Sequence, residues 1–163
     1  MYADNIASSD RRKCMRAQLA LAVDWLLTQQ NTLMEVDRFA PNRLLFNARS
    51  FQACAQFARD SKTRIESNLA SKDFVEAALE LYSVDGYFVE GAGHDTSYQG
   101  VSIRIGQDIL VAGYQDQQSR LRKTINQAAI WLPRRVDFDG RIDSSGNTRT
   151  CWSGERFFGE KKN

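Results

Sequence analysis

Residues 85–100 read DGYFVEGAGHDTSYQG, the most informative stretch of this sequence. The segment contains four glycines, the carboxylates Glu90 and Asp95, the chain's single histidine, His94, and Tyr98. Glycine lets the backbone bend tightly, and His, Glu, Asp and Tyr are the side chains that transfer protons. The pattern predicts a loop between two helices that carries a chemical or binding function. The simpler interpretation is a helix connector with a polar N-cap.

Helical patterns flank this loop over most of the chain. Apolar residues recur at helical spacing over residues 11–30, 42–59, 71–82, 95–111 and 116–132. Asp10, Ser71 and Asp116 are the expected N-caps of the first, third and fifth helices, and Pro133 is expected to end or kink the fifth. Only residues 87–89 are expected to be extended. The sequence therefore predicts an all-α protein.

The second helix, residues 42–59, has an apolar set that we expect on one face. The set consists of Leu45, Phe46, Ala53 and Phe57. Trp25 and Trp131 also lie among apolar helical residues and are expected in the core. Trp152 lies in the irregular tail, residues 137–163, and is the expected surface tryptophan.

Length and charge narrow the functional classes. The 163 residues suit a single domain. The formal net charge is +2, from 22 basic and 20 acidic residues mixed along the chain. So small an excess predicts no partner among nucleic acids or membranes.

The cysteine content and the N-terminal residues indicate the expected cellular compartment. Three widely spaced cysteines argue against a disulfide framework or a metal site, and Cys54 is expected in the core. The first residues lack the apolar core of a secretion signal. As written, the sequence predicts a cytoplasmic protein; a fragment of a longer chain would be compatible with a periplasmic or secreted one.

The sequence also repeats itself. A shift of about 52 residues aligns residues 42–50 with residues 94–102, which places Asn47 beside Gln99. Residues 84–88 and 138–142 form a second pair, each with an Asp-Gly after an amphipathic helix. Repeats of a helix, a long loop and a helix predict stacked antiparallel helical hairpins.

These motifs resemble the (α/α) toroid domains of polysaccharide lyases, a family that includes hyaluronate, chondroitin, alginate and heparin lyases. Asp-Gly-x-Phe followed by Glu-Gly over residues 85–91 is similar to a loop of that family, and Tyr98 stands where its helix-opening tyrosine would be. Residues 139–143 and 146–150 look like a final toroid loop. A complete toroid has several more hairpins, so the resemblance implies part of one. A second copy of the chain, or a longer parent chain, would be one way to complete the ring.

The resemblance implies β-elimination on an acidic polysaccharide. Asn42 or Asn47 with Arg43 would neutralise the uronate carboxylate, while His94 and Tyr98 would transfer protons. The substrate-binding residues expected around them are Asn47, Tyr87, Glu90, Asp95, Gln99, Asn147 and Arg149. Simpler roles remain open: His94 as a loop or capping residue, Tyr98 in the core, and Arg43 and Arg149 solvated or ion-paired.

Two other functions fit the same loop. Glu90 and Asp95 would be the acid and base of an (α/α)-barrel glycoside hydrolase, whose inverting members hold their carboxyls ~6.5–9.5 Å apart. Asp95 as a plain N-cap is the stronger interpretation of that residue. The other function is a non-catalytic helical-repeat module that binds carbohydrate or protein through its loops.

Residues 137–143 resemble a calcium loop only superficially. An EF-hand needs an acidic first position and a glutamate at the twelfth, and the matching register puts Arg135 and Gly146 there. A turn connecting two elements is the better interpretation. We expect no metal ion and no cofactor.

Overall fold

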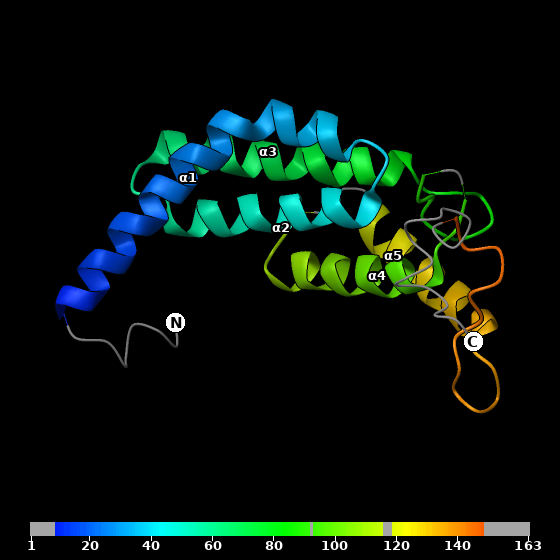
Figure 1. The fold of residues 1–163 in the computed structure, drawn as a ribbon. Helices are drawn as coiled ribbons and strands as arrows, with labels where there is room; N and C mark the ends of the chain where they lie inside the picture. The colour runs from blue at the N-terminus through cyan, green and yellow to red at the C-terminus, as the bar shows by residue number, and fades with distance from the viewer. Residues whose placement is uncertain (1–8, 92, 116–118, 149–163) are drawn as a thin grey trace.

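The computed structural model describes residues 9–91, 93–115 and 119–148 (Figure 1). These residues form α1 (Ser9–Asp37), α2 (Pro41–Phe57), α3 (Ser61–Glu80), α4 (Thr96–Val111), α5 (Arg120–Trp131) and the short 3-10 helix η2 (Leu132–Arg135). Extended structure in the described ranges is limited to isolated bridges, one of which joins Tyr82 and Phe88. The predicted all-α class is confirmed.

The helices are arranged as antiparallel hairpins in two layers. α2 pairs with α3 and α4 pairs with α5, and α2 also lies beside α4. α1 packs against α2 and, to a smaller extent, α3, and α5 also contacts α3. The chain returns to the same end of the molecule after α1, α3 and α5, which places three connections there (Figure 1).

The core lies mainly between α2 and α3. The rings of Phe51 and Phe74 stack with centroids 5.4 Å apart, and both side chains are fully buried. Cys54 is buried as predicted, and burial raises the pKa of its thiol. α4 and α5 approach each other tightly at Gly106, where an added Cβ would lie 2.3 Å from Ile125 Cδ1. A glycine at this position is what lets the second hairpin close.

The start of the third helix was predicted wrongly. α3 begins at Ser61, because the Asp60 side chain accepts a hydrogen bond from the Thr63 backbone N–H and caps it. Ser71 is instead buried in mid-helix and donates to the Ala48 carbonyl at 2.9 Å. Ser71 therefore links α3 to α2 by a buried hydrogen bond instead of capping a helix.

Two other caps and one apolar face also differ from prediction. Asp10 lies within the first turn of α1 rather than before it. α5 begins at Arg120 with Ser119 at its N-cap position, and not with Asp116, which lies outside the described residues. Phe46 and Phe57 are exposed. α2 buries a neighbouring stripe instead: Leu44, Leu45, Ala48, Phe51 and Ala55.

Trp25 is not in the core, because it lies on an exposed face of α1. The tryptophan side chain is 58% exposed, and the first part of α1 lies apart from the body of the molecule (Figure 1). Another face of the helix points inward: Val23 is 4% exposed, and Leu26, Leu27, Leu33 and Met34 pack against the core. An apolar pattern alone does not show which of the apolar residues of a helix face the core.

The predicted Asp-Gly repeat has a structural counterpart. Ser83 N–H donates to the Tyr87 carbonyl at 2.8 Å, and Asp137 N–H donates to the Arg141 carbonyl at the same distance. Gly86 and Gly140 have φ of 97° and 83°, in the region that favours glycine. The segment at 137–143 is therefore a connecting turn, as predicted. We call residues 81–89 the first turn and residues 135–143 the second turn.

Candidate functional site

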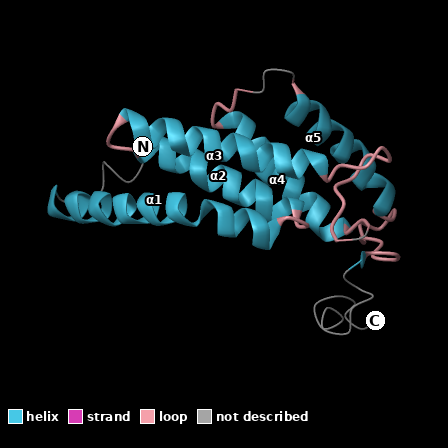
Figure 2. Ribbon diagram, turned by 90° about the horizontal axis from the view of Figure 1, so that it is seen from above, coloured by secondary structure: helices cyan, strands magenta, loops and turns pink. Residues whose placement is uncertain are grey.

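The connections at one end of the molecule gather into a single surface, seen from above in Figure 2. Gly91 N–H donates to the Phe39 carbonyl at 3.1 Å, which joins the α3–α4 loop to the start of α2. Thr148 N–H donates to the His94 carbonyl at 3.0 Å, which joins the tail to the same loop. We call this surface the loop rim: residues 38–40, 81–91, 93–95 and 135–148.

Three aromatic side chains meet at the loop rim: Tyr87 and His94 belong to it, and Trp131 is the last residue of α5. The ring of His94 lies 5.6 Å from that of Tyr87 and 5.5 Å from that of Trp131, and Tyr87 lies 5.3 Å from Trp131. All three are only partly buried. We call them the ring cluster. Two of its members were predicted site residues, and Trp131 was predicted to lie in the core.

Contacts with residues 145–148 of the tail hold His94 and its loop in place. Its Nε2 lies 3.4 Å from the Ser145 carbonyl oxygen. The neighbouring Thr148 hydroxyl is 2.9 Å from the Glu90 carbonyl, which ties both sides of the loop to the tail. With Nε2 protonated toward Ser145, the tautomer leaves Nδ1 with a lone pair.

Asp95 is the N-cap of α4. Its Oδ1 accepts from the backbone N–H groups of Ser97 and Tyr98 at 3.0 and 3.2 Å, and the residue is buried. The capping interpretation is confirmed. Tyr98 itself is partly buried one turn into the helix. Glu90, the other carboxylate of the predicted hydrolase pair, is buried.

Gln99 and Asn147, both predicted to bind substrate, bond to the protein backbone instead. The Gln99 amide donates to the Phe88 carbonyl at 2.7 Å and accepts from the Phe88 N–H at 3.2 Å. Asn147 Oδ1 accepts from the Thr96 N–H at 3.1 Å, at the start of α4. Both side chains are almost wholly buried, so their role is to fix the loop rim.

The predicted carboxylate-binding residues of α2 surround a buried aspartate. Arg43 Nη2 lies 2.6 Å from Asp37 Oδ1, and Asn47 donates to Asp37 Oδ2 at 2.7 Å. Asn42 is buried and accepts from the Arg43 backbone N–H at 2.8 Å. Asp37 is only 3% exposed and needs these partners. The positive charge of Arg43 is therefore already engaged.

An arginine holds the second turn. Arg135 Nη1 lies 3.0 Å from Asp143 Oδ2, and its Nη2 donates to the Ser145 carbonyl. Hydrogen bonds from the Ser145 hydroxyl and backbone lower the pKa of Asp143, and the charges of Arg135 and His94 add to the effect.

Arg149, the last predicted site residue, lies outside the described residues. Sequence reasoning missed the structural part played by Arg135, Ser145 and Thr148. The one available signal was the second Asp-Gly motif, which predicts that the tail forms a turn like the first one.

No family profile, curated protein or solved structure shows a significant match to this chain. Among the described residues, no group of three or more His, Cys, Asp or Glu side chains is placed to hold a metal ion. Within those same ranges, no helix has the length and apolar character needed to cross a bilayer.

Proposed function

We propose that this chain is a helical-hairpin carbohydrate-binding protein and that the loop rim is its binding surface. The observation that carries the proposal is the ring cluster. Tyr87, His94 and Trp131 come from separate segments and present partly exposed rings within 5.3–5.6 Å of each other. Aromatic faces beside polar groups suit a ligand with both apolar and hydroxylated surfaces, as a sugar has.

The polar groups around the cluster support binding over catalysis. His94 links the ring cluster to three polar groups. Its Nε2 contacts the Ser145 carbonyl, its charge acts on the Asp143 carboxylate, and Asp143 is paired with the Arg135 guanidinium. These groups offer both hydrogen-bond donors and acceptors to sugar hydroxyls. The predicted catalytic cation Arg43 is ion-paired with the buried Asp37, and Asn47 bonds to the same carboxylate.

A titration with oligosaccharides tests the proposal. Neutral and uronate-containing oligosaccharides would be added to the labelled protein, and the His94 and Trp131 ring signals followed by NMR. We expect one class to shift both rings in a saturable way. Trp131→Ala should abolish the shifts, because it removes the ring that both other rings contact.

Trp25→Ala is the matched control, since Trp25 is an exposed tryptophan on the projecting α1. It should leave binding unchanged. Circular dichroism establishes that both variants are folded. Saccharide binding that survives Trp131→Ala, or an absence of binding to every oligosaccharide, would refute the proposal.

The second candidate is β-elimination on an acidic polysaccharide. One observation favours it: the contact of His94 Nε2 with the Ser145 carbonyl leaves Nδ1 as a base. In this reaction Nδ1 would take the C5 proton of the uronate, the C4–O bond would break, Tyr98 would protonate the leaving oxygen, and a C4=C5 double bond would form.

The ultraviolet absorbance of the unsaturated product measures this reaction. His94→Gln should abolish product formation, while Trp25→Ala should not. If uronate oligosaccharides bind but no absorbance develops, the chain binds without cleaving, as the first proposal states.

A further inference from the structure

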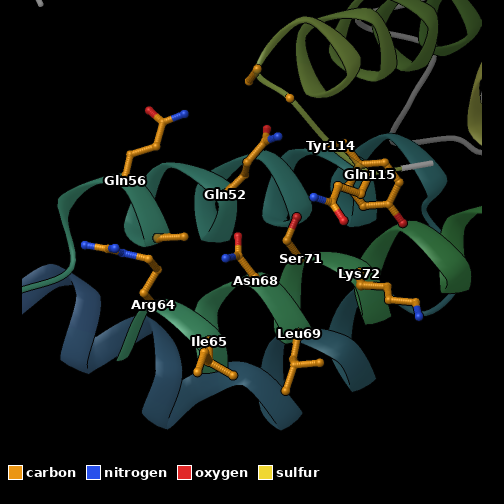
Figure 3. Close-up of a pocket in the computed structure, with 13 residues that line it drawn as sticks. Gln52, Gln56, Arg64, Ile65, Asn68, Leu69, Ser71, Lys72, Tyr114 and Gln115 are labelled. Carbon is orange, nitrogen blue, oxygen red and sulfur yellow. The ribbon is translucent and has the colours of Figure 1, made fainter. Parts of the chain in front are cut away.

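A second site lies away from the loop rim. A pocket of about 700 Å³ opens between the C-terminal half of α2, the first part of α3 and residues 112–115 (Figure 3). Its volume is within the ~300–1,000 Å³ typical of sites for small molecules. None of the predicted site residues lines it.

The charges of the pocket are all positive. Arg64 and Lys72 are its charged lining residues, and no carboxylate lines it. Among the contacts that the structure describes, neither side chain has an ion-pair partner, in contrast to Arg43, Arg104 and Arg120. Two unneutralised cations predict an anionic ligand.

The two cations lie at opposite ends of the pocket. They are eight residues apart on α3, which at the helical rise separates their backbones by ~12 Å. Figure 3 shows Arg64 on the side of Gln56 and Lys72 on the side of Tyr114 and Gln115, with Asn68 and Ser71 between them. One compact anion is too short to contact both ends.

The floor between the cations combines amide and apolar groups. The polar residues between the cations are Asn68 and Ser71, and the Ser71 hydroxyl already donates to the Ala48 carbonyl at 2.9 Å. Ala55, Ile65, Leu69 and Ala112 contribute the apolar part of the lining. This lining suits a carbon chain that carries few polar groups of its own.

We propose that this pocket binds an elongated organic dianion, with one acidic group at Arg64, the other at Lys72 and an extended body along the floor between them. Decanedioate is the probe, since its carboxylates lie at the two ends of a flexible chain of suitable length. Decanoate is the matched monoanion. Binding would be measured by calorimetry at low salt, where exposed charges are least screened.

We expect decanedioate to bind, and to bind more tightly than decanoate. Arg64→Gln and Lys72→Gln should each weaken decanedioate about three- to fivefold, as exposed ion pairs contribute up to ~1 kcal/mol. Ala112→Phe should block binding by filling the wall. Lys62→Gln is the control, because Lys62 lies on the same helix, is 84% exposed and does not line the pocket.

Three results would overturn the inference: no binding of decanedioate to the folded protein, equal affinity for decanoate, or an equal loss in Lys62→Gln. No binding would exclude dianions of this kind as ligands. Equal affinity for decanoate would exclude a site with two charged ends, and an equal loss in Lys62→Gln would show that any positive charge on the helix attracts the ligand. Trp131→Ala should retain decanedioate binding, so this test is separate from that of the loop rim.

Discussion

The two turns of the loop rim share one backbone and differ in what anchors it. Val89 N–H donates to the Leu81 carbonyl at 2.7 Å in the first turn, and Asp143 N–H donates to the Arg135 carbonyl at 2.7 Å in the second. The bridge between Tyr82 and Phe88 likewise corresponds to one between Val136 and Ile142. The equivalent residues are 54 positions apart in each case.

The first turn is anchored by burial. Phe88 is 1% exposed, and its ring meets that of Tyr82 edge-on at 5.2 Å. Gln99 of α4 satisfies both backbone groups of Phe88. Burial also raises the pKa of the Tyr82 hydroxyl.

The second turn is anchored by polar contacts. Its counterpart to Phe88, Ile142, is 54% exposed. Arg135 holds the turn through Asp143 and Ser145. The same backbone conformation can therefore be stabilised by buried apolar side chains or by an ion pair. We expect the second turn to open more readily than the first, because it buries fewer apolar groups.

The largest difference is expected when the equivalent apolar side chains are removed. Phe88→Ala should lower the free energy of unfolding by about 3–5 kcal/mol, the usual cost of deleting a buried aromatic side chain. Ile142→Ala should cost less than about 1 kcal/mol, because its side chain is half exposed. Denaturant unfolding measures both, and similar losses would show that the two turns are anchored alike.

Gln99→Ala should have the next largest effect. It leaves the buried Phe88 N–H and carbonyl without partners, and we expect a loss of about 2–3 kcal/mol. Gln107→Ala, at an exposed position of the same helix, is the control and should change stability by less than about 0.5 kcal/mol. If the Gln99 and Gln107 variants were equally stable, burial alone would hold the first turn.

Replacing the turn glycines should affect both turns equally. Gly86→Ala and Gly140→Ala each force a side chain into a left-handed backbone at φ 97° and 83°, at a cost of about 1–2 kcal/mol. An alanine Cβ at position 86 would have its nearest contact at 3.7 Å, and none within 4 Å at position 140, so sterics add little. Thermal unfolding of the two variants checks this, and a clear difference would mean that the backbones are not equivalent.

The smallest effect is expected from acid. Because hydrogen bonds from Ser145 lower the pKa of Asp143 below its unfolded value, the carboxylate stabilises the second turn fully above that value. This stabilisation is lost as the pH falls through the lower, folded pKa. The Ser145 amide resonance should therefore titrate below pH ~4, and Asp143→Asn should remove the titration. An unchanged titration in that variant would assign the effect to another carboxylate.

The sequence predicted the helices and the loop rim, but not what its polar residues contact. Residues 95–111 were placed correctly because the apolar period and the Asp95 cap agree. α3 began earlier than predicted because Asp60 and Ser71 are both good N-caps, and only tertiary packing decides between them.

Long-range polar pairs were the main omission. The contact of Thr96 with Asn147 spans 51 positions, and that of Thr148 with Glu90 spans 58. Neither periodicity nor spacing encodes such pairs, so residues like Asn147 were assigned to a substrate when the protein itself uses them. The Asp-Gly echo did predict that the tail forms a second turn.

We expect the loop rim to join one rigid turn to one that opens locally, with the ring cluster between them. Native-state hydrogen exchange of the Val89 and Asp143 amides tests it most directly, because both make the same backbone hydrogen bond. We predict that Val89 exchanges only through global unfolding, while Asp143 exchanges through a local opening of much lower free energy. Equal protection of the two amides, or greater protection of Asp143, would contradict the account.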